Sequence, residues 1–138
     1  MRRRILNTAL VLASTFGLSL VSANAAQAGP NGTCALGEVC LYYNSAENGL
    51  NAYFPQTFNI PSYKPYAFVQ SEHGGTGANQ SVYNNAAYVY NRSNGNFGVF
   101  YNSSYSCAVA CQEIISGQHI DLNSTMKNNN ASGGGGGF

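Results

Sequence analysis

Four cysteines are the residues with the clearest chemical potential in this chain: Cys34, Cys40, Cys107 and Cys111. Four cysteines allow three disulfide pairings. Because they come in two close pairs, the local bridges Cys34–Cys40 and Cys107–Cys111 are the most natural choice. Structural zinc sites usually place two to four residues between paired cysteines, whereas five separate Cys34 from Cys40. We therefore predict disulfides, which would close two small rings and stiffen the loops that carry them.

The histidines and acids could in principle support catalysis. His119 and Asp121 are two residues apart on an expected strand, so both would project from one face, and Ile120 and Leu122 would face the core. A His–Asp pair can orient a general base, but no serine stands in an elbow motif. His73 falls in a loop, and the acids are too scattered to suggest paired catalytic carboxylates. We predict a binding module, not an enzyme, with His119 and Asp121 on a solvent-facing surface.

Residues 1–28 have the pattern of a secretory signal peptide. Arg2, Arg3 and Arg4 precede an apolar stretch, and small residues follow it. Ala26-Gln27-Ala28 is a candidate cleavage motif, and Ala23-Asn24-Ala25 is a second one. The apolar stretch is shorter and more polar than the roughly 20 residues that a membrane span needs. We therefore expect a secreted, extracellular protein without a membrane span, whose cysteines can be oxidised.

The composition that remains after removal of the leader excludes some classes of partner. The remaining chain would carry three bases and five acids, a net charge of −2. Nucleic-acid binding asks for clustered Lys and Arg, and so does attachment to an anionic membrane surface. All ten tyrosines lie in this part of the chain, and Tyr supplies large buried area with a polar handle. A single small β domain rich in tyrosine is the expected result.

Short alternating apolar segments, each bounded by Gly, Asn, Ser or Pro, are typical of β-strands. They predict strands at residues 39–43, 87–90, 97–101, 114–115 and 119–122. No window of a dozen residues after the leader keeps a helical apolar period without interruption by Gly or Pro. The fold class expected from this spacing is all-β, as a sandwich of Greek-key units.

A weak internal repeat suggests two related β motifs. Residues 41–45 match residues 99–103, and residues 83–87 resemble residues 128–132 in the same order. Residues 133–138 follow as five glycines and Phe138. Glycine-rich segments behave as flexible coil, so we expect one domain over residues 29–132 and a flexible tail from Gly133 onward.

Three segments in order resemble the actinobacterial peptidase inhibitor family I36. The first is the C-x-x-G-x-x-C-L-Y opening from Cys34, which follows the leader directly. The second is Ala87-Tyr88-Val89-Tyr90-Asn91-Arg92, and the third runs from Ser116 to Leu122 with the Asn-rich segment 128–132. The resemblance covers roughly residues 34–132. It implies a βγ-crystallin-like Greek-key sandwich and inhibition of a secreted, thermolysin-like metalloprotease.

The family's type member presents its reactive bond in an exposed loop closed by a disulfide. Carried over by position, the candidate loop is Cys107, Ala108, Val109, Ala110 and Cys111, with Cys107–Ala108 as the reactive bond. The loop is shorter than the family's, and a purely structural bridge is the alternative. The expected partner is thus a secreted protease, and the protein is expected to act as a monomer.

The βγ-crystallin resemblance also raises the question of calcium, which such modules often bind through an N/D-N/D-x-x-S/T-S turn. Residues 128–133 match this pattern except at the last position. Asn128, Asn129 and Ser132 are weak calcium candidates, because the turn contains no carboxylate and calcium sites favour anionic oxygens. We therefore expect no resident cofactor.

Two other functions remain open at this point. One is an antimicrobial or cell-envelope module without inhibitory activity, in which the clustered tyrosines contact glycan. The other is a purely structural extracellular protein.

Overall fold

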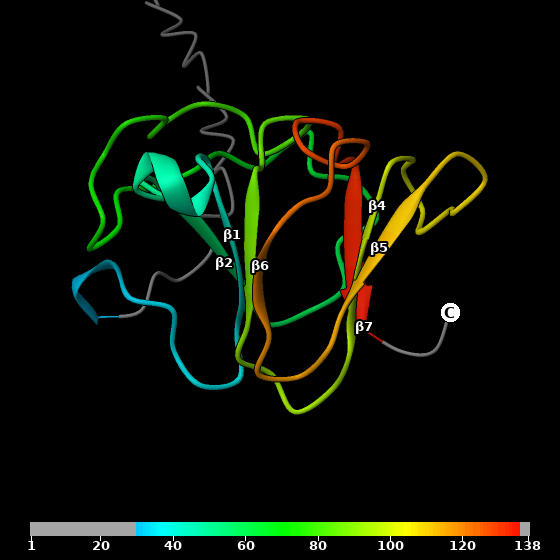
Figure 1. The fold of residues 1–138 in the computed structure, drawn as a ribbon, viewed down its shortest axis with the longest axis horizontal. Helices are drawn as coiled ribbons and strands as arrows, with labels where there is room; N and C mark the ends of the chain where they lie inside the picture. Colours follow the sequence, from blue (N-terminus) through cyan, green and yellow to red (C-terminus); the bar gives the residue numbers. More distant parts are fainter. Residues whose placement is uncertain (1–29, 136–138) are drawn as a thin grey trace, which may run out of the picture.

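The computed structural model describes residues 30–135, which fold into two antiparallel sheets (Figure 1). The predicted leader, residues 1–28, lies outside the described residues. The first sheet has the strand order β2-β1-β3-β6, and the second has the order β5-β4-β7. The strands are β1 (Val39–Tyr42), β2 (Tyr53–Gln56), β3 (Tyr88–Asn91), β4 (Phe97–Phe100), β5 (Cys111–Ile114), β6 (His119–Asp121) and β7 (Ser132–Gly135). Two short 3-10 turns, η1 (Pro30–Gly32) and η2 (Ala46–Asn48), complete the elements. The all-β prediction is confirmed.

Alternation along the strands places apolar side chains on both faces of the first sheet. Leu41 of β1 and Val89 of β3 are fully buried in the main core between the sheets. Their neighbours Tyr42 and Tyr88 point to the opposite face, where they join a second, smaller cluster with Cys34. Because successive strand residues point to opposite faces, this tyrosine layer follows directly from the Leu-Tyr and Tyr-Val alternation. Within residues 30–135, no helix is both long enough and apolar enough to cross a membrane.

Each sheet contains segments from both halves of the domain, where each half carries one copy of the internal repeat. β6 follows β5 in the sequence but pairs with β3 in the first sheet. Conversely, Ile60 belongs to the first half but forms an isolated antiparallel bridge with Gly133 of β7 in the second sheet. The two halves therefore exchange one segment each, which interlocks them around a shared core.

The internal repeat occupies equivalent places in the two halves. β1 and β4 are both inner strands of their sheets. The Asn-rich turns that precede β3 and β7 meet through reciprocal hydrogen bonds, from Asn84 N–H to the Asn130 carbonyl (2.9 Å) and from Asn128 N–H to the Ala86 carbonyl (2.8 Å). Asn84 and Asn128 both have positive φ, 60° and 59°. The structure thus makes Asn84 equivalent to Asn128, whereas the sequence match aligned Asn84 with Asn129.

The prediction of a flexible tail from Gly133 is wrong for its first three residues. Ser132–Gly135 form β7, which pairs with β4 along its whole length. Gly133 and Gly134 are buried, and a Cβ on Gly133 would lie 2.0 Å from the Tyr63 hydroxyl oxygen. Glycine is present because no side chain fits between the sheet and its neighbours, a constraint that a glycine-rich composition does not reveal. The domain therefore extends to at least Gly135, and residues 136–138 lie outside the described part.

Three other details differ from the predicted strands. β2 was not predicted, because it contains Pro55; the strand lies at the edge of its sheet, where proline is tolerated. β5 begins earlier than predicted, at Cys111. Leu122 is buried as expected, but Ile120 is 37% exposed, since β6 is also an edge strand and its outer side has no neighbouring strand.

Candidate functional site

The predicted reactive loop lies in the connection between β4 and β5, which projects outward beyond the sheets (Figure 1). The disulfide between Cys107 and Cys111 joins Cα atoms 5.1 Å apart. Cys107, Ala108 and Val109 are exposed, and the Val109 side chain is 62% exposed although it is apolar. The five predicted residues are thus together at the surface of a bridged hairpin.

The base of this hairpin is fixed to both halves of the domain. Ser104 N–H donates to the Pro61 carbonyl (2.8 Å), and Tyr105 N–H donates to the buried Ser132 hydroxyl (3.1 Å). In the described part of the chain, the only backbone hydrogen bond of residues 107–109 runs from Ala108 N–H to the Ser106 hydroxyl (3.3 Å). The outer segment is therefore held by its ends, and most of its backbone groups remain available to a partner.

Of the calcium candidates, Asn128 and Asn129 lie in the turn that precedes β7 and Ser132 is the first residue of β7. Two of the three are used by the protein itself. The Ser132 hydroxyl donates to the Asn102 carbonyl (2.7 Å) and accepts from Tyr105 N–H. The Asn129 amide donates to the Thr125 carbonyl (2.9 Å). Ser132 is fully buried, so this hydroxyl serves to anchor the hairpin. Calcium binding stays a prediction.

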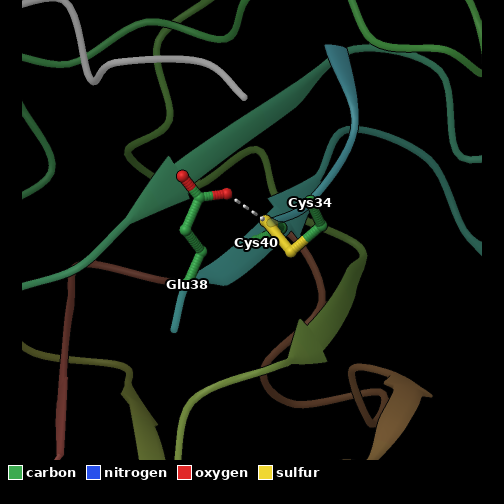
Figure 2. A group of neighbouring side chains, drawn as sticks. All are labelled: Cys34, Glu38 and Cys40. Carbon is green, nitrogen blue, oxygen red and sulfur yellow. Dashed lines mark hydrogen bonds between the residues drawn. A yellow bond between two sulfur atoms is a disulfide. The ribbon is translucent and has the colours of Figure 1, made fainter. Parts of the chain in front are cut away.

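Both local disulfides are confirmed, and the first one determines the chemistry of a nearby cluster. Cys34, Glu38 and Cys40 bring three potential metal-ligand atoms within 4.8 Å of one another (Figure 2). The two sulfurs are bonded to each other, whereas the thiolate is the form that ligates metals. The Glu38 carboxylate accepts from Ala35 N–H (2.7 Å). In this oxidised state the cluster closes a loop and does not offer a thiolate metal site.

His119 and Asp121 have separate partners. The Asp121 carboxylate accepts from Ala46 N–H at the start of η2 (2.9 Å). His119 Nδ1 lies 2.8 Å from the Tyr88 hydroxyl. Both residues are exposed, as predicted, but they do not form a pair with each other. Asp121 holds a turn, and His119 belongs to a different site.

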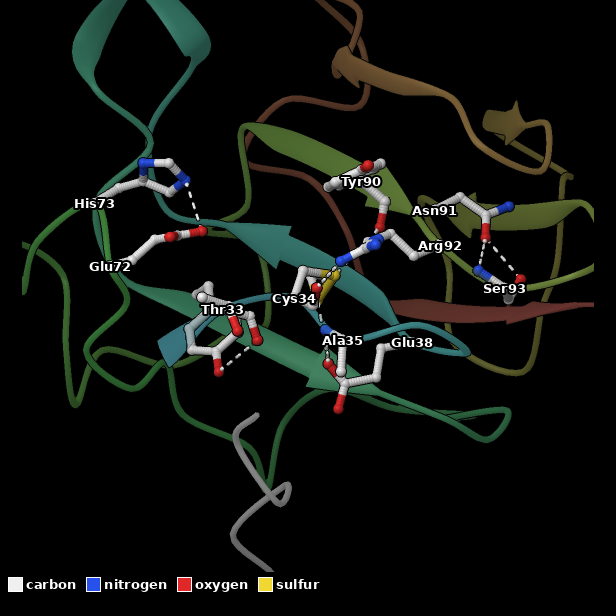
Figure 3. The surroundings of a disulfide bond; sticks show 12 residues. Thr33, Cys34, Ala35, Glu38, Glu72, His73, Tyr90, Asn91, Arg92 and Ser93 are labelled. Carbon is white, nitrogen blue, oxygen red and sulfur yellow. Dashed lines mark hydrogen bonds and ion pairs between the residues drawn. A yellow bond between two sulfur atoms is a disulfide. The ribbon is translucent and has the colours of Figure 1, made fainter. Parts of the chain in front are cut away.

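That site is a groove over the outer face of the first sheet, with a volume of about 470 Å³. Aromatic and titratable side chains from four separate segments line it. They are Tyr42, Glu72, His73, Tyr88, Tyr90, Arg92 and His119. Figure 3 shows Glu72 and His73 on one side of the Cys34–Cys40 disulfide and Tyr90 with Arg92 on the other.

The groove's side chains hold one another in place. The Tyr90 ring has the Arg92 guanidinium 5.6 Å from its centre and the His119 ring 5.4 Å away in an edge-to-face contact. Arg92 also donates to the Cys34 carbonyl (2.6 Å). On the other side, the His73 ring lies 5.8 Å from the Tyr42 ring, again in an edge contact. The walls are therefore positioned without a ligand.

The environment of the groove favours the neutral form of the Tyr42 and Tyr88 hydroxyls. Burial, and after it the negative charge of Glu72, raises the pKa of the Tyr42 hydroxyl far above its usual value. Burial, with a smaller contribution from Asp121, also raises the pKa of Tyr88. Both hydroxyls consequently remain hydrogen-bond donors over the physiological range.

The sequence analysis did not predict this groove, although it singled out His73 and His119 separately. A usable signal was present in Tyr88 and Tyr90, which are two residues apart on a predicted strand and so share a face. What the sequence did not show is which strands lie beside them. β1 and β6 flank β3, and this neighbourhood brings Tyr42 and His119 to the same face.

Comparisons with known proteins bear on the fold. No protein-family model and no curated protein matches the chain, so the resemblance to family I36 is not confirmed. A solved structure described as "Evolution of the eye lens beta-gamma-crystallin domain fold" is similar, with a TM-score of 0.58 and 15% sequence identity. The similarity covers 80% of this chain and 95% of that one. At this identity the likeness concerns the fold alone, and this chain therefore has the βγ-crystallin-like Greek-key sandwich that was predicted.

Proposed function

We propose that this protein is a secreted, non-enzymatic inhibitor of an extracellular, thermolysin-like metalloprotease. The observation that carries the proposal is the β4–β5 hairpin, an exposed segment closed by Cys107–Cys111 and anchored at its base. The two disulfides support an oxidising location, because cytosolic proteins rarely keep such bonds. The small apolar residues Ala108 and Val109 present the side chains that would enter the protease.

Inhibition by insertion of a loop depends on limiting the entropy lost on binding. A bridged segment is already ordered, so less free energy is spent on fixing it in the cleft. The backbone groups of residues 107–109 that have no partner in the hairpin can pair with an extended edge of the protease. Ala108 and Val109 fit a small apolar pocket, with Cys107–Ala108 as the bond placed at the catalytic centre.

The test is the inhibition constant against thermolysin, measured with the secreted protein and its variants. Ala108→Asp places a charge in the apolar pocket, and a burial cost of about 3 kcal/mol corresponds to about a hundredfold rise in the constant. Ala67→Asp is the matched control, because Ala67 is also exposed but lies far along the chain from the hairpin. Its inhibition constant should equal that of the wild type.

The disulfide gives a second variant. In Cys107→Ser/Cys111→Ser the loss of loop constraint, about 2 kcal/mol for a ring of this size, should raise the constant up to about thirtyfold. A wild-type protein that leaves thermolysin fully active would refute the proposed target. Equal constants for Ala108→Asp and the wild type would refute the assignment of the loop.

A further inference from the structure

The groove over the first sheet has the size and the convergence of side chains that are typical of a small-molecule site. Its volume of about 470 Å³ falls within the range of about 300–1,000 Å³ that ligand pockets occupy. Its floor is the tyrosine layer on the outer face of β1 and β3. Its sides come from the loop at His73 and from Tyr90 with Arg92.

The sides of the groove offer rigid aromatic surfaces. Tyr90 is half-buried and is held by contacts with the Arg92 guanidinium and the His119 ring. His73 keeps 40% of its side chain exposed while one edge packs on Tyr42. Rings of this kind bind flat, weakly polar faces through dispersion and through their electron-rich surfaces. The C–H face of a sugar ring is such a surface.

Polar atoms stand beside these rings. The Tyr42 side chain lines the floor of the groove, and the Glu72 carboxylate, 3.6 Å from His73 Nε2, is 47% exposed. The Tyr88 hydroxyl and His119 Nδ1 share one hydrogen bond. Together these groups offer both donors and acceptors, and sugar hydroxyls require both because each is itself a donor and an acceptor.

The charges of the groove argue against an ionic ligand. Among residues 30–135, Arg92 is the only Lys or Arg in the lining, and it already donates to the Cys34 carbonyl and contacts the Tyr90 ring. A phosphate would instead favour a free guanidinium or a cluster of cations. In the described part of the chain, Glu72 is the only carboxylate in the lining, and one carboxylate is too few for a hard cation such as calcium. A neutral ligand with many hydroxyls fits this balance.

From these observations we propose that the groove binds one ring of a neutral oligosaccharide, with Tyr90 and His73 as its aromatic walls. The site does not involve the β4–β5 hairpin, so it is a second function beside the inhibition proposed above. Because the walls are already fixed by contacts within the protein, binding would cost little conformational entropy. A neutral sugar with few hydrogen bonds should bind weakly, with a dissociation constant in the millimolar range.

The experiment is a titration of the folded, disulfide-bonded protein with chitotriose, cellotriose and maltotriose, followed by NMR chemical shifts. At least one of these sugars should give saturable shifts confined to groove residues such as Tyr90, His73 and His119. Tyr90→Ala and His73→Ala should each weaken binding by about tenfold or more. Phe58→Ala is the matched control, since it removes an aromatic side chain that is 55% exposed and lies outside the groove.

Tyr90 contributes to packing, so its variant must be compared with the wild type by circular dichroism. His73 lies in an exposed loop, and His73→Ala therefore tests the proposal even if Tyr90→Ala fails to fold. Absence of saturable shifts with all three sugars would overturn the proposal. So would binding that His73→Ala leaves unchanged, or groove shifts that appear only with inorganic phosphate.

Discussion

Replacing Gly133 by alanine tests whether the last strand is part of the core. Gly133 pairs with Val99 in the second sheet. The new Cβ would lie 2.0 Å from the Tyr63 hydroxyl oxygen and 2.7 Å from Phe97 Cζ. Both distances are far below van der Waals contact, so the tyrosine and the phenylalanine must move.

The cost of this movement has two parts. Forcing an extra methyl group into a packed core costs about 1–3 kcal/mol. Tyr63 is fully buried and donates from its hydroxyl to Gln56 Oε1 at 2.6 Å, and loss of that bond leaves a buried acceptor, at a cost of about 1–3 kcal/mol. The unfolded alanine variant has less conformational entropy than the unfolded wild type, which reduces the loss of stability by about 0.4–1 kcal/mol. We expect a net loss of about 3 kcal/mol in the free energy of unfolding.

The measurement is equilibrium unfolding in urea with both disulfides intact, followed by circular dichroism. Gly95→Ala is the control, because a Cβ at Gly95 meets nothing within 4 Å; its stability should stay within about 0.5 kcal/mol of the wild type. If Gly133→Ala were as stable as Gly95→Ala, the placement of residues 132–135 as a strand packed between Ile60 and β4 would be wrong.

Two further predictions concern buried polar groups. Asn130→Ala should lower the free energy of unfolding by about 2–5 kcal/mol, because the buried Asn130 amide donates to the Val82 carbonyl (2.8 Å) and accepts from Ala86 N–H (2.9 Å). Equilibrium unfolding in urea measures this loss of stability, and a loss below about 1 kcal/mol would contradict the prediction. Burial and the charge of Glu72 raise the pKa of Tyr42 in the folded protein. Its contribution to the free energy of unfolding is therefore complete at neutral pH and is lost as the pH rises above about 10, where the tyrosine of the unfolded chain ionises first. Tyr42→Phe removes this titration, so its stability should fall less than that of the wild type between about pH 9 and pH 11; equal falls would show that Tyr42 is not responsible.

The central strands could be predicted because their side chains carry the signal. In β3 two tyrosines alternate with Val89, β1 is a short apolar run that ends in Tyr42, and each strand is bounded by turn residues. The disulfides could be predicted for a related reason, since cysteines that are close in the sequence can meet without any knowledge of the fold. In these cases the information that determines the structure is local.

β2 and β7 could not be predicted, because what allows them to form is their position in the sheets. Pro55 is compatible with β2 because this strand lies at the edge of its sheet. In β7, positions 133 and 134 require glycine because Tyr63 and Asn59 occupy the space where side chains would be. A glycine-rich composition is equally typical of a flexible tail, and only the neighbouring residues distinguish the two.

Both candidate sites depend on the exchange of segments between the two halves. In the groove, His119 reaches Tyr90 because β6 crosses from the second half and pairs with β3, placing these residues opposite each other. In the hairpin, which belongs to the second half, Ser104 is anchored on Pro61 from the first. Neither half of the repeat contains a complete site. Both candidate sites therefore require the two halves to be interlocked.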